Sequence, residues 1–464
     1  MRRNQFSIPH RRFKVLSSPA VLKTGLIACA ALLLLSACSN TEDSDPGYAV
    51  VPESYAVGQI SITFVDTSRS TAAHGPVPEA PSRTLETDIV YPAEGAPGGT
   101  VTAGAPAYPS TTPYPLVVLS HGLGGSVEHL MPLAQVWAAS GYIVALPRFP
   151  LTNFSTPGGP VAQDVQNQPA DVSFVIDEIL SMSSVPGELL HNAVDGEKIA
   201  AGGHSNGGIT TYGLVANSCC RDPRIDAALV LSGTTSPFAD GEYNLSEIPP
   251  ILIVHGIYDD LILYNSAVRT YNTLLPLKGL LTLDESDHGS YFSPQDPAFD
   301  TVAIATTDFF DATLRDDSAA MARLPEDQAA GVATMHWASD DASNIPVELL
   351  PEPETNRQAF LSVADNLVDG QVITVTWSGF LPGKVVNIMQ CTGDVTGGAA
   401  ACNISGGTLF LQNPTGMGSH EQLIRTGPIG NGVCDSANPC TVIVNDAGLT
   451  EEDAIVRIPI TFAN

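Results

Sequence analysis

The strongest constraint on the fold is an alternation of short, β-rich apolar runs with helical patterns between residues 58 and 315. Parallel strands need long crossover connections and are buried on both faces, so this alternation predicts a mostly parallel sheet with helices on both sides. We expect the first two strands to form a leading antiparallel pair. The predicted strands are 60–65, 85–91, 116–120, 142–146, 199–202, 228–232, 251–255 and 280–283, and the predicted helices are 130–139, 170–181, 209–216, 266–275 and 302–314.

The first 37 residues have the pattern of an export signal. A basic stretch precedes the apolar run 26–35, which is too short to span a bilayer as a permanent helix. The run ends in Leu35-Ser36-Ala37-Cys38, which resembles the lipobox of bacterial lipoproteins. The resemblance implies a mature protein that is lipidated on Cys38 and anchored in the cell envelope, and Ser39 favours the outer membrane. An ordinary cleaved signal, which would leave a secreted protein, is the alternative.

Charge and cysteine content agree with export. Removal of residues 1–37 leaves 14 basic and 49 acidic residues, a net charge of −35. Such a surface repels phosphate backbones, so we expect no nucleic acid partner. Apart from Cys29 and Cys38, six cysteines remain, four of them in one C-terminal group, which is typical of an oxidising compartment. We expect a monomer.

Composition divides the mature chain into four segments. Residues 38–55 are rich in Asp, Ser, Pro and Gly, which is typical of a tether. Residues 56–315 carry the strand and helix alternation and form the expected catalytic domain. Residues 316–358 lack a clear period, so we predict a linker with some helix around 321–333. Apolar residues then alternate with period two, which predicts a separate all-β domain at 359–464.

The sequence Gly203-His204-Ser205-Asn206-Gly207 satisfies the pattern G-x-S-x-G. It lies between the predicted strand 199–202 and the predicted helix 209–216, which is the context that this motif requires. A tight turn with a glycine on either side exposes the serine hydroxyl at the end of the strand. Ser205 is therefore the predicted nucleophile of a serine hydrolase.

A serine hydroxyl is a weak nucleophile at neutral pH, so it needs a base within hydrogen-bond reach and a carboxylate that orients the base. Asp259 follows the predicted strand 251–255, and His288 follows the next one, which gives the chain order Ser, Asp, His. We predict Asp259 as the acid and His288 as the general base, with Asp260 as the alternative acid. The other histidines precede the nucleophile or lie outside the domain, apart from His255, which precedes the acid.

The oxyanion that forms during ester hydrolysis needs two backbone N–H donors. We expect one from Asn206 and one from the glycine-rich turn 120–125, in which Leu123 is the favoured donor. A phosphate cradle is the alternative role of this turn, but the Walker lysine and the full dinucleotide fingerprint are missing. No cluster of cysteine, histidine or carboxylate residues has metal spacing, so we predict an enzyme without metal or cofactor.

Five motifs together carry a family resemblance. They are Asp66-Thr67-Ser68-Arg69, Arg83-Thr84-Leu85, Tyr91-Pro92-Ala93, Ser120-His121-Gly122-Leu123-Gly124 and Gly203-His204-Ser205-Asn206-Gly207-Gly208. They resemble the platelet-activating-factor acetylhydrolase, chlorophyllase-like and predicted bacterial dienelactone hydrolase esterases. The resemblance covers residues 56–315 and implies an α/β-hydrolase fold and hydrolysis of carboxylic esters through an acyl-enzyme. Asn206 is a departure, because many relatives carry a bulkier apolar residue there.

The connection 233–250 between two predicted strands is too short for a folded cap, so we expect an open site for short acyl esters or exposed polymer chains. An acyltransferase or peptidase with the same triad is one alternative. A non-catalytic surface-binding protein that retains the hydrolase shell is another.

A second group of motifs lies in the C-terminal region. They are Val368-Asp369-Gly370-Gln371, Gly379-Phe380-Leu381-Pro382-Gly383, Gln390-Cys391, Ala401-Cys402-Asn403 and Cys434 with Cys440. They resemble the neocarzinostatin family, which implies an immunoglobulin-like β-sandwich with the disulfides Cys391–Cys402 and Cys434–Cys440. Cys219 and Cys220 either form a vicinal bridge or stay free. We expect an accessory domain for adhesion or substrate contact.

Overall fold

The computed structural model describes residues 54–463, except for 75–76, 240, 352–354, 383, 394–400, 430–431 and 447–454. The predicted export signal, the lipidation site Cys38 and nearly all of the predicted tether lie outside the described residues. Within the described part of the chain, no helix combines the length and the apolar character needed to cross a membrane.

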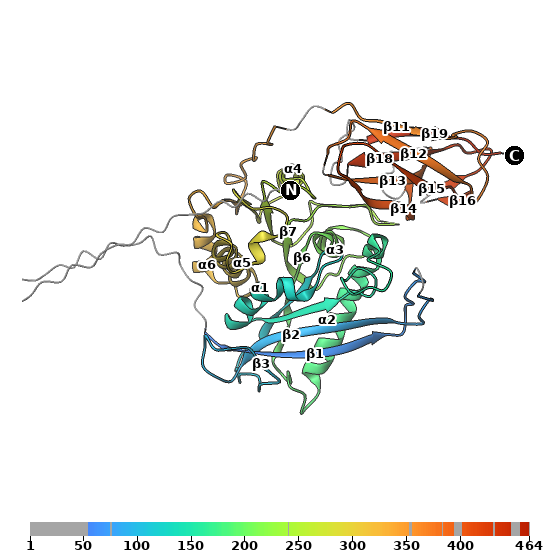
Figure 1. Cartoon of the computed structure of the whole chain (residues 1–464). Helices are drawn as coiled ribbons and strands as arrows, with labels where there is room; N and C mark the ends of the chain where they lie inside the picture. The colour runs from blue at the N-terminus through green and yellow to red at the C-terminus, as the bar shows by residue number, and fades with distance from the viewer. Residues whose placement is uncertain are drawn as a thin grey trace, which may run out of the picture. The chain divides into compact units, whose positions relative to one another are not determined.

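A ten-stranded mixed sheet organises the region before residue 340 (Figure 1). Its strand order is β10-β9-β8-β7-β6-β4-β5-β2-β1-β3. The six strands from β9 to β5 in this order are parallel, whereas β1, β2 and β10 join antiparallel neighbours. The strands are β1 (Ala56–Asp66), β2 (Arg83–Ala93), β3 (Thr102–Ala103), β4 (Tyr114–Ser120), β5 (Ile143–Arg148), β6 (Val194–His204), β7 (Ile225–Leu231), β8 (Ile251–Gly256), β9 (Lys278–Leu283) and β10 (Ala333–Ala338).

Helices cover both faces of this sheet. The helices that pack on it are α1 (Val127–Ala139), α2 (Gln168–Ser184), α3 (Asn206–Ala216), α4 (Tyr264–Thr273) and α5 (Phe299–Leu314), and a 3₁₀ turn, η1 (Ala162–Asn167), precedes α2. Alternate residues of β4 enter two separate cores: Val117 and Leu119 pack with α1 and α5, whereas Leu116 and Val118 pack with α2, α3 and α4. This period of two, with both faces apolar, explains why the central strands are continuous apolar runs.

All eight predicted strands are present, and the leading antiparallel pair is confirmed. The predicted linker 316–358 contains helix near the expected position, as α6 (Ser318–Arg323) and the 3₁₀ turn η3 (Leu324–Glu326). It also contains β10, which was not predicted and which pairs with β9 as an edge of the sheet, so the linker prediction is wrong there. An edge strand packs mainly through one face and one neighbour, so its short sequence, Ala-Thr-Met-His-Trp-Ala, lacks the apolar run of a central strand. His336 and Trp337 belong to this strand.

The C-terminal region is all β. A three-stranded sheet, β11-β12-β15, and a four-stranded sheet, β14-β13-β18-β19, share one core, in which Ile373 and Val375 of β12 meet Val386 of β13 and Val442 of β18. This arrangement is a sandwich of two antiparallel sheets. The strands are β11 (Gln358–Leu361), β12 (Val372–Ser378), β13 (Lys384–Thr392), β14 (Cys402–Asn413), β15 (Gly418–Leu423), β16 (Gly427–Ile429), β17 (Gly432–Cys434), β18 (Cys440–Asp446) and β19 (Ile455–Ile460).

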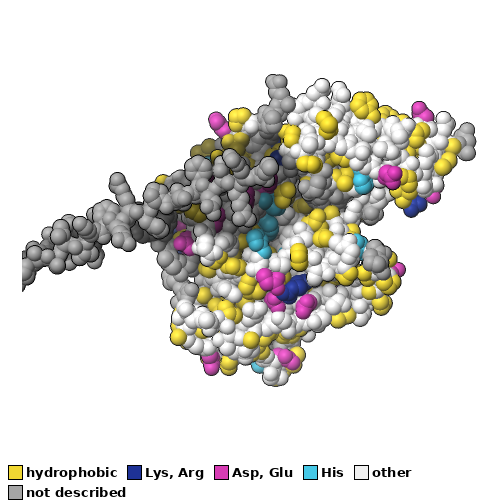
Figure 2. Space-filling view, in the orientation of Figure 1, with side chains coloured by type: hydrophobic (Ala, Val, Ile, Leu, Met, Phe, Trp, Pro, Cys, Tyr) yellow, Lys and Arg dark blue, Asp and Glu magenta, His cyan; other side chains and the backbone are white. Residues whose placement is uncertain are grey.

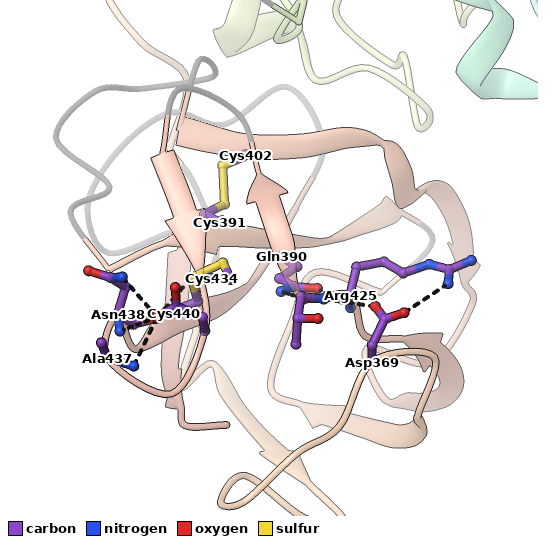
Figure 3. The surroundings of a disulfide bond; sticks show 11 residues. Asp369, Gln390, Cys391, Cys402, Arg425, Cys434, Ala437, Asn438 and Cys440 are labelled. Carbon is purple, nitrogen blue, oxygen red and sulfur yellow. Dashed lines mark hydrogen bonds and ion pairs between the residues drawn. A yellow bond between two sulfur atoms is a disulfide. The ribbon is translucent and has the colours of Figure 1, made fainter. Parts of the chain in front are cut away.

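Two disulfides brace the sandwich (Figure 3). Cys391 of β13 is bonded to Cys402 of β14, and Cys434 of β17 is bonded to Cys440 of β18, which are the two pairs that the family resemblance implies. Beside them, the side-chain amide of Gln390 is hydrogen-bonded to the backbone N–H and C=O of Arg425, at 2.9 and 2.7 Å. Of the two states left open for Cys219 and Cys220, the structure has the vicinal bridge.

Candidate active site

Ser205 lies at a sharp turn between β6 and α3. Its φ of 56° and ψ of −116° fall in a region that residues other than glycine rarely adopt, which is the strain expected of a nucleophile elbow. Space explains the neighbouring glycines: a Cβ atom at Gly203 would collide with the carbonyl group of Gly207, and one at Gly207 would collide with the carbonyl oxygen of Ser120. The close approach of β4, β6 and α3 therefore depends on this motif.

Asp259 lies in the turn after β8 and is buried. Its Oδ1 accepts hydrogen bonds from the backbone N–H groups of Leu261 and Ile262, at 2.9 and 2.8 Å. Its Oδ2 lies 2.7 Å from Nδ1 of His288 and 3.1 Å from Nε2 of His255. Burial alone would raise the pKa of this carboxyl, but the hydrogen bonds from the two histidine side chains hold it far below its usual value. Asp259 is therefore a carboxylate over the whole neutral range.

The geometry distinguishes between the two candidate acids. The Asp259 carboxylate contacts the imidazole of His288, whereas Asp260 is an exposed residue. Because Oδ2 is an acceptor, Nδ1 of His288 carries the proton, and Nε2 keeps its lone pair. The loop that bears His288 is itself fixed. The carbonyl oxygen of His288 lies 2.7 Å from Nε2 of His204, and the Asp287 carboxylate accepts hydrogen bonds from the backbone N–H groups of Gly289 and Ser290.

A cavity of about 220 Å³ brings the predicted residues together. Its lining includes Ser205, His288 and the turn that contains Leu123, so the predicted nucleophile, the predicted base and one predicted oxyanion donor face one space. The ring of His204 lies against the ring of His288 at a centroid distance of 4.8 Å, and against Phe292 at 4.9 Å. Histidine side chains also gather on the face of the molecule drawn in Figure 2. The cavity lies at the carboxyl ends of β4, β6 and β8, where ligands bind in open parallel sheets.

The two predicted oxyanion donors occupy suitable positions. Asn206 is the first residue of α3, and the first N–H groups of a helix have no partner within the helix and lie at its positive end. Leu123 lines the cavity, and the turn around it approaches the nucleophile, because a Cβ atom at Gly122 would lie 3.1 Å from Cβ of Ser205. Both N–H groups are thus near the place where an oxyanion would form.

His121 stabilises the same turn. It is buried, its Nδ1 lies 2.7 Å from the carbonyl oxygen of Gly122, and its Nε2 accepts a hydrogen bond from the N–H of Phe149 at 3.2 Å. Burial lowers the pKa of His121 to about 4, so the ring is neutral when it holds the turn.

Comparison with known proteins identifies one part of the chain. Residues 360–462 match the neocarzinostatin family. A solved structure, the ferulic acid esterase from Streptomyces cinnamoneus, is similar at a TM-score of 0.44 and 23% identity, over 58% of this chain and 93% of that one. No curated protein matches the chain. The C-terminal sandwich is thus a neocarzinostatin-like domain, which accounts for its two disulfides and its two antiparallel sheets.

Sequence reasoning missed several side chains that support the site. Gln168 is fully buried at the start of α2; its amide N–H₂ group donates to Thr152 Oγ1 at 2.6 Å, and its amide oxygen accepts hydrogen bonds from Asn206 and Thr210. Gln168 therefore ties the first turns of α3 to the loop before η1. His204 contacts the carbonyl oxygen of His288, and His255 contacts the Asp259 carboxylate. The contacts of Gln168 and His204 join residues far apart in the chain, whereas His255 lies only four positions before Asp259.

Two of the motifs that carry the esterase resemblance form a buried ionic network. The Arg83 guanidinium is fully buried and forms ion pairs with Asp164 and Asp171, at 2.8 and 2.6 Å, and Arg69 also reaches Asp171 at 2.8 Å. Burial alone would lower the pKa of Arg83, but the hydrogen bonds from its guanidinium to the two carboxylates raise it. The network joins β2 to η1 and α2, and hence to Gln168.

The described residues contain no candidate metal site. Across the described residues of both the mixed-sheet region and the neocarzinostatin-like domain, no three His, Cys, Asp or Glu side chains are grouped as metal ligands.

Proposed function

We propose that the region before the neocarzinostatin-like domain is an α/β-hydrolase, related to the esterase group that its motifs resemble, which hydrolyses carboxylic esters. One observation carries the proposal: His288 is bonded through Nδ1 to a buried carboxylate and lines the same cavity as Ser205, a serine on a strained elbow. A base that is fixed in one tautomer and shares a cavity with a serine hydroxyl is the arrangement that activates serine.

The proposed reaction has two steps. Nε2 of His288 takes the proton of Ser205 Oγ as the oxygen attacks the ester carbonyl carbon, and the oxyanion is stabilised by the N–H groups of Leu123 and Asn206. The carbonyl–oxygen bond to the alcohol then breaks, and His288 gives its proton to the departing oxygen. A water molecule attacks the acyl-enzyme in the same way and releases the acid and Ser205. Asp259 remains ionised throughout and stabilises the imidazolium.

Cavity size suggests the substrate class. About 220 Å³ is less than the volume of a typical pocket for a drug-sized ligand, and Leu123 and Leu261 in its lining are each 36% exposed. The described residues between β7 and β8 form no helix or strand. Short acyl groups, or one ester unit of an exposed polymer chain, fit such an opening.

The export signal suggests where the enzyme acts. We propose that Cys38 carries a lipid and anchors the protein in the cell envelope. Mass spectrometry of the intact protein after detergent extraction tests this: we expect a mature chain that starts at Cys38 with added acyl mass. An unmodified chain would refute the anchor and leave a secreted protein.

The activity is tested with p-nitrophenyl esters of increasing acyl length. We expect turnover of the acetate and butyrate and a decline with longer chains, and Ser205→Ala should reduce kcat by about 10⁶-fold if the triad acts as a unit. Ser246→Ala is the control, because among the described residues this exposed serine is hydrogen-bonded to Asn244 alone. Equal rates for Ser205→Ala and the wild type would refute the esterase proposal, whereas faster transfer to an added alcohol than to water would favour an acyltransferase.

A further inference from the structure

A second imidazole lies on the catalytic carboxylate. His255, in β8, is fully buried, and its Nε2 lies 2.9 Å from the carbonyl oxygen of Ile262 and 3.1 Å from Oδ2 of Asp259. Both neighbours are acceptors, so Nε2 must carry the proton. Nδ1 has no hydrogen-bond partner among the described residues, as expected for the unprotonated nitrogen of a neutral ring.

The carboxylate of Asp259 is held at both oxygens by four donors. The two backbone N–H groups of Leu261 and Ile262 fix Oδ1, but hydrogen bonds to one oxygen alone let the carboxylate swing about that oxygen. His255 supplies a donor to Oδ2 besides that of His288. The direction in which Oδ2 faces His288 is therefore set before the base accepts a proton.

The surrounding backbone leaves His255 little freedom. A Cβ atom at Gly256 would collide with the carbonyl oxygen of Ser286, so the loop that carries the base packs directly on the end of β8. The N–H of Tyr258 donates to the same carbonyl oxygen at 3.1 Å. The ring of Tyr264 packs edge-on against His255 at a centroid distance of 6.2 Å. The loops of the acid and the base are thus joined next to this imidazole.

We propose that His255 is a positioning residue of the triad, which orients the Asp259 carboxylate toward His288 through its Nε2–H group. The inference rests on the function proposed above. A neutral donor suits this role, because it orients the carboxylate without cancelling the charge that must stabilise the imidazolium of His288. A lysine or arginine in the same place would pair with the carboxylate and compete with the base.

Three variants test the role. His255→Leu removes the donor, whereas His255→Gln keeps an N–H at the same number of bonds from the backbone as Nε2. Tyr264→Phe is the matched control, because it removes a buried hydrogen bond to Thr282, 2.7 Å long, beside His255 but away from the carboxylate. For each variant, kcat and KM are measured on p-nitrophenyl butyrate, with active sites counted by organophosphonate titration. The low-field proton resonance of the bond between His288 Nδ1 and Asp259 is recorded as a second readout.

We expect His255→Leu to lower kcat per titrated site by about 10- to 100-fold with KM changed less than about twofold, and to broaden or shift the low-field resonance. His255→Gln should recover most of both, and Tyr264→Phe should resemble the wild type. Unchanged kcat per site and an unchanged resonance in His255→Leu, even if fewer sites titrate, would overturn the proposal and leave a role in folding alone. If the wild type hydrolyses no ester, the proposed function fails, while the resonance still reports whether His255 orients Asp259.

Discussion

Replacement of Asp259 by asparagine is the perturbation whose outcome the geometry determines most closely. Oδ1 accepts hydrogen bonds from two backbone N–H groups, so the amide oxygen of an asparagine must take that position. The amide N–H₂ group then replaces Oδ2 and points its protons at Nδ1 of His288. His288 can respond only by accepting there, which moves its own proton to Nε2, on the side of Ser205. A base that is protonated toward the nucleophile cannot take the serine proton.

The expected loss in kcat is about 10⁴-fold, or about 5.5 kcal/mol of transition-state stabilisation. KM should change little, because the carboxylate does not touch the substrate. The assay is hydrolysis of p-nitrophenyl butyrate with sites counted by titration, and Asp260→Asn, at the exposed neighbouring position, is the control that should stay within about twofold of the wild type. If Asp259→Asn kept more than about a tenth of the wild-type kcat, the tautomer argument would be refuted.

Three further predictions concern stability. Burial and the nearby Asp308 carboxylate raise the pKa of Asp327 from 3.8 to about 8, so the folded protein loses stability as pH rises between these values. Asp327→Asn should therefore raise the free energy of unfolding by about 1–3 kcal/mol at pH 8 and by little near pH 4. An equal gain at both pH values would contradict the pKa shift. The double variant Cys391→Ser, Cys402→Ser should destabilise the neocarzinostatin-like domain by about 2–3 kcal/mol in chemical denaturation, without loss of activity on soluble esters; unchanged unfolding would argue against the bond. Arg83→Met leaves Asp164 without its cation and Asp171 with Arg69 alone, and it should cost about 3–5 kcal/mol in the same measurement, so a loss below about 1 kcal/mol would contradict the burial of the network.

Local patterns made the central part of the fold predictable. The strands around β4, β6 and β8 are buried on both faces, so each is a continuous apolar run that can be recognised without knowledge of its neighbours. The elbow at Ser205 was predictable for the same reason: two glycines and a serine between a strand and a helix describe one turn. The order of Asp259 and His288 along the chain followed from where the strands end.

Other features depend on contacts between distant residues. β10 is an edge strand with one neighbour, and its sequence alone does not distinguish it from a linker. Its pairing with β9 is what makes it a strand. Gln168 is hydrogen-bonded to Asn206, 38 positions away, and His204 to His288, 84 positions away. Neither residue type indicates in the sequence that it has such a distant partner. His255 was excluded as the base because of chain order, and the structure supports that exclusion. The side chain of the same histidine nevertheless contacts the Asp259 carboxylate, and this contact is evident only from the three-dimensional structure.

The central claim is that Ser205, His288 and Asp259 form one proton-transfer unit, and its most direct test is covalent labelling. The wild-type protein is treated with a fluorophosphonate and digested, and the modified peptide is sequenced by mass spectrometry. We predict a single adduct on Ser205, formed rapidly in the wild type and at least about 100-fold more slowly in His288→Ala. Labelling of another residue, or labelling of Ser205 at the same rate without His288, would contradict the account.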